Sequence, residues 1–470
     1  MNSNANNSPA SDATSEGNTY DWPLAYEAEH LLYQYIEAFL LRHRCARNLA
    51  DRMRDESGTE FYEWVDHLTM SPDHRDELVT AGMTVEEIET PGGVTVLHHP
   101  KAMMPRVFLC TEGSTNGVPA TLAVKPEVLA EFLRLHAPEA KIEGKEGARY
   151  RLALVAEENG LRLEAVERLG YRGFTIDQPE PGFVEAIREG QKLFSNRQRE
   201  FNEDGEGAKH AMVVVDQVLT LVPRDVACEL FFAEERRFWE LRNHAGRVQK
   251  KRQDSLGLGW GNHDHHTFRC SRGLFPDLVQ FLEKLGLQKR ERFYAGAEAG
   301  WGAQVLESPN VGIVVFADVD LRPDEVNEDY ATKCLPEVER LGTVGLWCEL
   351  HGDSFLQAGM HHLEARFDFI RLRDQLAKAG VGTMAPFSNF PFLKQAFTEG
   401  ERWFVKPARV AKLKARGLIT SEQADAFLHE GAIGSHLENL QRKGGFKGFN
   451  QKAVSAIIAQ TDPRKAAKVS

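Results

Sequence analysis

The 470-residue sequence has few cysteines, no long apolar run and no excess of positive charge. Its six cysteines stand far apart and form no C-x-x-C pair, which argues against a disulfide framework and a cysteine zinc site. Because no stretch of about 18 apolar residues occurs, the sequence predicts no transmembrane helix. A formal net charge of −12 argues against general binding to nucleic acid or anionic membranes. We therefore expect a cytoplasmic protein that acts on a small molecule.

The length predicts more than one compact core, either two or three domains or one large pseudo-symmetric core with insertions. Residues 1–20 are polar and lack the apolar centre of a signal peptide, so they are expected to form a disordered tail. Residues 441–470 are rich in lysine and arginine. Because they lack dense aromatic interleaving, they are interpreted as a solvated basic tail and not as a nucleic-acid arm.

Between these tails, one strand–helix–strands pattern occurs twice. The first unit lies within 21–112, after a helix predicted at 24–56, and the second lies within 259–352. Residues 113–258 are predicted to be a mostly helical insertion, and residues 353–440 a helical C-terminal region. The expected fold is α+β, with two pseudo-symmetric units that form a central curved sheet around a metal site, and with large helical insertions.

Each unit opens with the pattern D-H-x-T, which places His67 in the first unit and His265 in the second. Side chains on a strand alternate between faces, so each histidine shares a face with the threonine two positions later. If the two units pack as pseudo-symmetric halves, His67 and His265 are expected to approach one another. Such a pair of imidazoles is a candidate for two ligands of a divalent metal.

A carboxylate would complete a 2-His-1-carboxylate triad, which leaves three positions for substrate and O₂. The preferred candidate is Glu349, in the stretch "LWCELHG" on a strand predicted at 343–351. Apolar residues flank it, and a buried ionised glutamate needs a cation as partner. Asp318 and Asp320, in "FADVD", are the alternatives.

Other histidines lie close to the second D-H-x-T pattern or form pairs of their own. His263 is expected to share a face with the second-unit ligand and is the alternative to it. His266 points to the opposite face and is expected to pack or to support a ligand. His361 and His362 begin a helix predicted over 361–380, which places them at the surface.

The sequence resembles the 2-oxoadipate dioxygenase/decarboxylase family, also called hydroxyglutarate synthases, of the glyoxalase-like vicinal-oxygen-chelate superfamily. The stretches that carry the resemblance are "WVDHLTM", "VTVLHHPKAMMPRVFL", "DHHTFR" and "LWCELHG". The resemblance implies that His67, His265 and Glu349 hold Fe(II), and that a small 2-oxo acid is oxidatively decarboxylated with O₂. It also implies that Arg269 anchors a substrate carboxylate, whereas Ser71 stands where the family has a second arginine.

Two other functions remain open on the same residues. One is another metalloenzyme of the same scaffold, such as a Zn²⁺, Ni²⁺ or Mn²⁺ isomerase, a lyase or an extradiol-type dioxygenase. The other is a metal-free protein that binds a small molecule. The identity of a bound metal separates the enzymes, because O₂ chemistry needs a redox metal and Zn²⁺ is not one. The sequence leaves the oligomeric state open.

Overall fold

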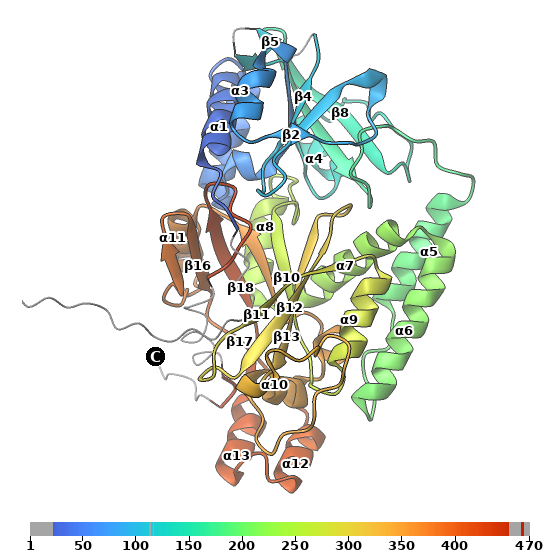
Figure 1. Cartoon of the computed structure of the whole chain (residues 1–470), viewed down its shortest axis with the longest axis vertical. Coiled ribbons are helices and arrows are strands. Elements are labelled where there is room, and N and C mark those ends of the chain that lie inside the picture. Colours follow the sequence, from blue (N-terminus) through green and yellow to red (C-terminus); the bar gives the residue numbers. More distant parts are fainter. Residues whose placement is uncertain (1–21, 112–113, 116, 451–461, 465–470) are drawn as a thin grey trace, which may run out of the picture.

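The structure of the chain, a computed structural model, describes residues 22–111, 114–115, 117–450 and 462–464. The predicted disordered tail at 1–20 lies outside the described residues, as do 451–461 and 465–470 of the predicted basic tail. Two bodies follow one another along the long axis, each built around its own sheet (Figure 1). No helix in the described part of the chain is long and apolar enough to cross a membrane.

The first sheet has the strand order β2-β3-β4-β1-β7-β9-β8. Its strands are β1 (Val65–Met70), β2 (Thr84–Val85), β3 (Thr95–His98), β4 (Arg106–Leu109), β7 (Thr121–Val124), β8 (Tyr150–Glu158) and β9 (Leu161–Arg168). The helices of this half are α1 (Tyr26–Leu40), α2 (Arg44–Arg52), α3 (Arg75–Thr80) and α4 (Leu129–His136), and a short ribbon pairs β5 (Ser114–Thr115) with β6 (Val118–Pro119). The predicted order of strand, helix and strands is confirmed as β1, α3, β2, β3 and β4.

The second sheet has the strand order β11-β12-β13-β10-β14-β18-β16-β15, and β17 also pairs with β18. Its strands are β10 (His263–Arg269), β11 (Gln288–Tyr294), β12 (Trp301–Ser308), β13 (Ile313–Asp320), β14 (His362–Arg366), β15 (Ser388–Phe390), β16 (Leu393–Phe397), β17 (Glu401–Trp403) and β18 (Ala432–Arg442). The second strand–helix–strands unit is confirmed as β10, α9 (Phe275–Lys284), β11, β12 and β13.

The two halves have the same topology. In each, the opening strand is parallel to the last strand of its unit and antiparallel to a strand that follows later in the chain, β7 for β1 and β14 for β10. A parallel strand comes next, β9 beside β7 and β18 beside β14. The α+β class and the repeat are therefore confirmed. The expectation of one central sheet shared by both units is wrong, because each unit completes a sheet with its own downstream strands.

Two predicted boundaries change for the same reason. Residues 113–258 are rich in helix but are not one insertion, because β7, β8 and β9 belong to the first sheet. The helical C-terminal region expected at 353–440 is wrong, because it supplies β14, β16 and β18 to the second sheet. Residues 343–351, expected as a strand, form helix α10 (Thr343–His351). A short apolar run buried on all sides has no periodicity that separates strand from helix.

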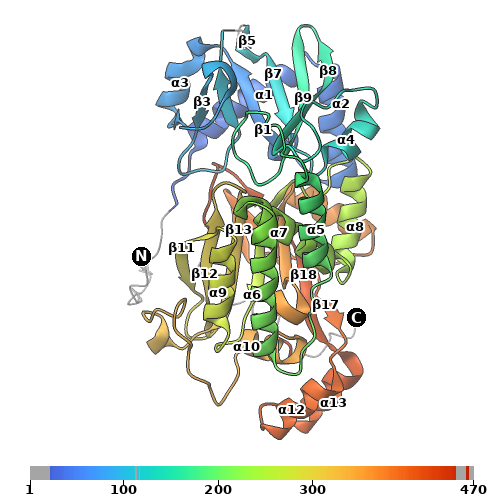
Figure 2. The same ribbon diagram turned by 90° about the vertical axis from the view of Figure 1, so that its right-hand side faces the viewer.

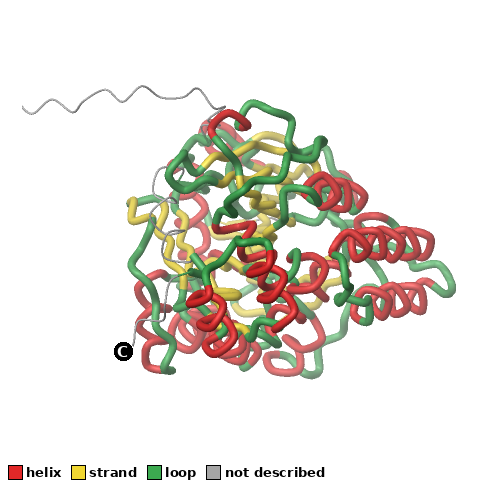
Figure 3. The backbone as a smooth tube through the Cα atoms, turned by 90° about the horizontal axis from the view of Figure 1, so that it is seen from below, coloured by secondary structure: helices red, strands yellow, loops and turns green. Residues whose placement is uncertain are grey.

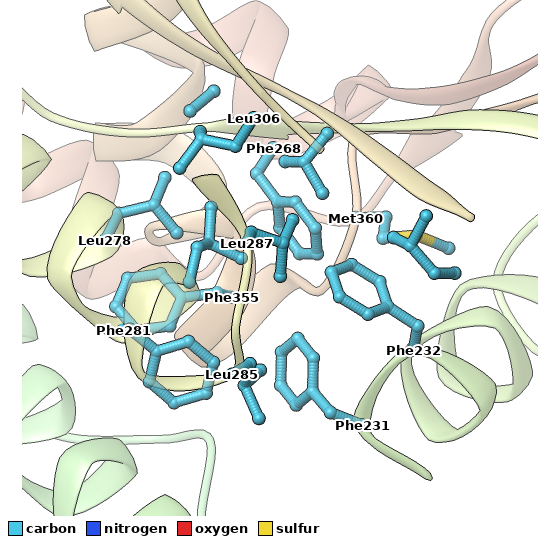
Figure 4. Packing of buried hydrophobic residues seen from close by; sticks show 14 of the residues in the cluster. Phe231, Phe232, Phe268, Leu278, Phe281, Leu285, Leu287, Leu306, Phe355 and Met360 are labelled. Atoms are coloured by element: carbon cyan, nitrogen blue, oxygen red, sulfur yellow. The ribbon is translucent and has the colours of Figure 1, made fainter. Parts of the chain in front are cut away.

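Helices cover one face of the second sheet (Figure 2). They are α5 (Phe183–Ser195), α6 (Asp204–Leu221), α7 (Arg224–Glu240) and α9, with α8 (His244–Asp254) beside the first half. Phe231 and Phe232 from α7 lie among Phe268 of β10 and Phe281 of α9 in the main apolar core (Figure 4). The ring of Phe232 is 6.2 Å from that of Phe268 and 4.9 Å from that of His266. These contacts fix which face of β10 meets the helices.

The remaining helices lie around the other elements of the second half. They are α11 (Phe369–Lys378), α12 (Pro407–Ala415) and α13 (Ser421–Glu430). Seen from below, strands lie near the centre of the molecule and helices lie toward its outside (Figure 3). Because His266 and Phe268 face the helices, alternation places His265, Thr267 and Arg269 on the opposite face of β10. That face holds the candidate site.

Candidate metal centre

A row of three ionisable side chains crosses three neighbouring strands of the second sheet. His265 on β10 pairs with Glu364 on β14, and Glu364 pairs with Glu438 on β18. Residues in register on adjacent strands project to the same face, so the three side chains converge. One ligand atom from each of the three lies within 4.8 Å of the others, and all three residues are buried.

A second imidazole touches this row from two residues earlier on β14, on the same face of the strand. His362 Nε2 is 2.5 Å from Glu364 Oε1 and 3.8 Å from Glu438 Oε2. His265 Nε2 is 2.7 Å from the same Glu364 Oε1. The carboxylate of Glu364 therefore lies between two imidazoles, and His362 is a fourth potential ligand beside the group of three.

The electrostatics of the cluster fit a divalent cation. Burial raises the pKa of Glu364 well above its usual range, and the neighbouring Glu438 carboxylate raises it further. Burial likewise raises the pKa of Glu438. Glu364 Oε2 is buried and has no hydrogen-bond donor. Two adjacent buried carboxylates need a cation to offset their desolvation, and neutral imidazole with carboxylate is a donor set that iron, manganese and zinc accept.

The orientation of His265 is set by residues behind it. Asp264 Oδ1 lies 2.9 Å from His265 Nδ1, which leaves Nε2 to face the cluster. Arg442, at the end of β18, binds both oxygens of Asp264 with distances of 2.9 and 3.0 Å. Although burial opposes it, the Arg442 guanidinium holds the pKa of Asp264 well below its usual range. A fixed imidazole of this kind is the usual arrangement of a histidine ligand.

The cluster lines a cavity of about 70 Å³. Its polar lining includes His265, His362, Glu364, Glu438, Thr267, Arg269, Asp318 and Gln395. Its aromatic lining consists of Phe293, Trp301, Phe316, Phe387, Phe397 and Phe449. One part of the cavity is therefore ionic and the rest is apolar, an arrangement that keeps water away from the charged groups.

Arg269 provides unused hydrogen-bond donors in this cavity. Its side chain is fully buried, its Nε and Nη1 have no acceptor, and its guanidinium lies 5.8 Å from the ring centre of Trp347. The residue opposite it on β13 is Asp318, whose carboxyl group interacts with the guanidinium through charge. A planar fork of free N–H groups suits a carboxylate or a phosphate. The predicted anchoring residue thus lies in the same cavity as the metal-capable cluster.

Asp318, which lines this cavity, is expected to make the stability of the protein depend on pH. Burial raises its pKa to about 8, against the opposing effect of Arg269, whereas an unfolded aspartate titrates near about 3.9. Between these two pKa values, the folded state retains a proton that the unfolded state loses. The free energy of unfolding therefore falls as pH rises from the unfolded pKa to the folded pKa of Asp318. We expect metal-free wild type to lose stability relative to Asp318→Asn between about pH 5 and pH 8. Urea unfolding at several pH values tests this, and parallel pH profiles for the two proteins would contradict it.

The structure does not bring the three predicted ligands together. His67 lies in the other half of the molecule, where it contacts Asp66 at 2.9 Å and stacks on Phe108 at 4.3 Å. Among the described residues, the one group that could hold a metal contains His265 but neither His67 nor Glu349. The shared site expected from His67, His265 and Glu349 is therefore wrong. The physical reason is that each D-H-x-T strand lies at the centre of a separate sheet.

The alternatives considered for the carboxylate also have other partners. Glu349 lies on α10, where its carboxylate accepts a bond of 2.6 Å from Arg416 outside the cavity. Asp320 accepts the backbone N–H groups of Val344 and Gly345 at the start of α10. Asp318 lies in the cavity but outside the convergent group. The carboxylates that converge on His265 are instead Glu364 and Glu438.

His263 does not share a face with His265. The register of β10 with β14 shifts between these two residues, which marks a bulge. His263 consequently lies beside His266, with ring centres 5.3 Å apart, and its Nδ1 is 3.0 Å from the carbonyl of Trp260. The expectation of a shared face fails because the alternation of side chains is interrupted at the bulge.

The first half contains an incomplete copy of the cluster. His67 pairs with Ala123 on β7, which pairs with Glu164 on β9, so alanine stands where Glu364 stands in the second half. Thr121 likewise takes the place of His362, because it pairs with Thr69 as His362 pairs with Thr267. Glu164 is engaged by Arg162 at 2.8 Å. Two of the four donors are thus missing.

The support behind the two histidines is nevertheless the same. Arg168, at the end of β9, binds both oxygens of Asp66 at 2.8 and 2.9 Å, as Arg442 binds Asp264. The ring of Phe174 then covers His67, with ring centres 5.3 Å apart. The first half therefore keeps the scaffold of the site with only two of its four potential ligands.

His362, Glu364 and Glu438 were missed by the sequence analysis. The helix predicted over 361–380 begins as β14, whose polar residues at 362, 364 and 366 alternate with Leu363 and Ala365. That period of two is the signal of a strand. A second signal is the similarity of "LEAVER" at 163–168 to "LENLQR" at 437–442, which marks β9 and β18 as equivalent strands.

No protein-family model matches the chain, and no curated protein matches it in sequence. Among solved structures, the chain is similar to a putative hydrolase from Shewanella frigidimarina, with 13% identity, a TM-score of 0.33, and coverage of 48% of this chain and 98% of that one. It is also similar to a mutant 4-hydroxymandelate synthase from Streptomyces coelicolor, with 12% identity, a TM-score of 0.28, and coverage of 85% and 98%. Methylmalonyl-CoA epimerase from Mycobacterium tuberculosis matches with 11% identity, a TM-score of 0.23, and coverage of 39% and 88%. At these scores the likenesses carry no conclusion about function.

Proposed function

We propose that the chain is a mononuclear metal-dependent enzyme of the vicinal-oxygen-chelate type, which binds Fe(II) and oxidatively decarboxylates a small 2-oxo acid with O₂. The observation that carries this proposal is the buried convergence of His265, Glu364 and Glu438, with His362 in contact, inside a cavity that also holds Arg269. Two imidazoles and a carboxylate form the donor set of non-haem iron oxygenases. The resemblance to 2-oxoadipate dioxygenase/decarboxylase in the "DHHTFR" stretch agrees with this choice.

Four polar residues and the aromatic lining of the cavity have a part in the proposed reaction. His265, His362 and Glu438 would hold the metal, and Fe(II) bound there supplies the redox chemistry with O₂ and the 2-oxo acid. Arg269 binds a substrate carboxylate through its free N–H groups, which fixes the orientation of the substrate. The aromatic lining excludes water from the reacting groups.

The test is oxygen consumption by the Fe(II)-loaded protein with a panel of 2-oxo acids that differ in chain length, in a second carboxylate and in an aromatic group. The proposal predicts O₂ uptake matched by release of CO₂ for at least one member of the panel. Binding of Fe(II) without O₂ uptake for any 2-oxo acid would contradict it. Absence of metal binding by the wild-type protein would favour the metal-free binding protein instead.

A second candidate function rests on the presence of two carboxylates in the cluster. If Glu364 and Glu438 both stay on the metal with His265 and His362, a substrate that chelates the metal leaves no position for O₂. The arrangement then suits a non-oxidative isomerase or lyase, in which the metal acts as a Lewis acid. Turnover with Zn²⁺ or Mn²⁺ in the absence of O₂ would identify this function.

Arg269 provides a separate test of substrate binding. We expect Arg269→Met to weaken the binding of a 2-oxo acid to the metal-loaded protein by about 10- to 100-fold, the worth of a hydrogen bond to a charged group. Metal content should stay unchanged, because Arg269 touches none of the proposed ligands. Isothermal titration calorimetry measures the affinity, and Arg269→Lys should retain part of it. Equal affinities for wild type and Arg269→Met would contradict the anchoring role.

A further inference from the structure

The cluster has one donor more than the three that the proposed function needs, and this extra donor is Glu364. The role inferred below for Glu364 rests on the proposed metal site and concerns how a coordination position at that site becomes free. Glu364 occupies the centre of the cluster, since its Oε1 lies within 2.7 Å of His265 Nε2 and 2.5 Å of His362 Nε2. A cation held by both imidazoles is therefore within reach of this carboxylate.

The two carboxylates of the cluster differ in how firmly the protein holds them. Glu438 Oε1 accepts a hydrogen bond of 2.8 Å from Gln395 on the neighbouring strand β16. Glu364 has no comparable anchor. Its hydrogen bond with Glu438 needs a proton shared by the two carboxyl groups, which a bound metal would displace, and the hydroxyl of Thr267 is 3.5 Å from its Oε1. Its two short contacts are both to imidazoles whose nitrogens a metal would take. With a metal present, Glu364 is thus the less restrained carboxylate.

A carboxylate with weak protein contacts is the ligand that an incoming chelator can displace. Thr267 offers a place for it, because the Thr267 hydroxyl faces Glu364 across the β10–β14 pair and can shorten its long contact. Glu438 cannot leave without breaking its bond to Gln395. The chain thus contains one carboxylate built to stay on the metal and another that is free to move.

We propose that Glu364 is a fourth metal ligand in the resting protein and that a chelating anionic substrate displaces it. The carboxylate then moves toward Thr267, and one coordination position beside the chelate is released. A site with four protein ligands and six positions has room for a chelate alone, so the release supplies the position that the proposed oxygen chemistry requires. Glu364 thereby couples the opening of that position to the arrival of substrate.

The experiment counts metal-bound water in the Mn²⁺-loaded protein by electron paramagnetic resonance in ¹⁷O-enriched water, before and after addition of oxalate. Oxalate is a chelating dianion, and it occupies two positions of an octahedral ion. If Glu364 leaves, oxalate displaces one water together with this carboxylate. If Glu364 stays bound or was never bound, oxalate displaces two waters.

The wild-type protein is expected to lose one water on addition of oxalate, and Glu364→Ala is expected to lose two. The variant should also start with one water more than wild type. Loss of two waters by wild type would overturn the proposal, and this measurement needs no variant. Glu349→Gln is the matched control, because Glu349 lies outside the cavity and pairs with Arg416; it should behave as wild type.

Failure of this inference and failure of the proposed function give different results. A wild-type protein that binds no Mn²⁺ overturns the metal site and the inference with it. A protein that binds Mn²⁺ and loses two waters retains the metal site and overturns the role of Glu364 alone. The water count is independent of catalytic activity, so an unidentified substrate does not affect the outcome.

Discussion

Replacement of His265 by alanine is expected to remove stoichiometric metal from the protein, whereas the same replacement of His67 is expected to leave the metal content unchanged. His265 Nε2 faces Glu364 at 2.7 Å in the convergent group, whereas His67 has alanine at the position equivalent to Glu364. Loss of one ligand from a three- or four-ligand site lowers metal affinity by orders of magnitude. Elemental analysis of protein purified without oxygen measures the effect.

The repeat makes His67→Ala an unusually close control. Both histidines lie on the central strand of a sheet, both contact the preceding aspartate through Nδ1 at 2.9 Å, and both are buried. The two substitutions remove the same atoms from equivalent environments, so a difference in metal content reports the ligand role. Equal loss of metal from both variants would contradict the site described here and favour a metal shared between the halves.

Substitution of Arg442 by methionine is expected to destabilise the second half by about 3–5 kcal/mol, because it leaves Asp264 buried without a cation. Arg442 binds both oxygens of Asp264 and also donates to the backbone carbonyls of Phe446 and Gly448. Metal affinity should fall as well, because the released Asp264 no longer fixes His265. Urea unfolding measures the stability, and metal titration measures the affinity.

Two further variants separate stability from metal binding. Arg168→Met makes the equivalent change in the first half, where it frees Asp66, and should destabilise that half without lowering metal affinity. The double variant Asp264→Asn with Arg442→Met removes the buried charge and should recover part of the lost stability. An Arg442→Met protein as stable as wild type would show that the buried pair contributes nothing to the fold.

The sequence predicts the repeated unit and one ligand of the site because both depend on local patterns. The D-H-x-T stretches alternate as strands do, and each is followed by a helix and further strands at similar spacing. Alternation puts His265 and Arg269 on one face of β10, and that face lines the cavity; the anchoring role of Arg269 comes from the family resemblance. The prediction that His263 shares a face with His265 is wrong for an equally local reason, because a bulge changes the face of a single residue.

The partners of His265 could not be predicted in the same way. Which strand lies beside β10 is decided by pairing across about a hundred residues of sequence, and alternation within one strand carries no information about its neighbour. Glu349 was favoured because apolar residues flank it, but the helix α10 buries those residues and turns the glutamate outward to Arg416. Glu364 lies on a strand whose alternating polar residues resemble an exposed face, and Glu438 lies in a stretch without strict alternation.

The measurement that tests the metal centre most directly is a crystal structure of the metal-loaded protein with anomalous scattering recorded at the absorption edge of the metal. We expect a single strong peak within bonding distance of His265 Nε2, His362 Nε2 and a carboxylate oxygen of Glu438, with none beside His67 or Glu349. A peak at His67, or no peak in the cavity of a protein that binds metal stoichiometrically, would contradict it.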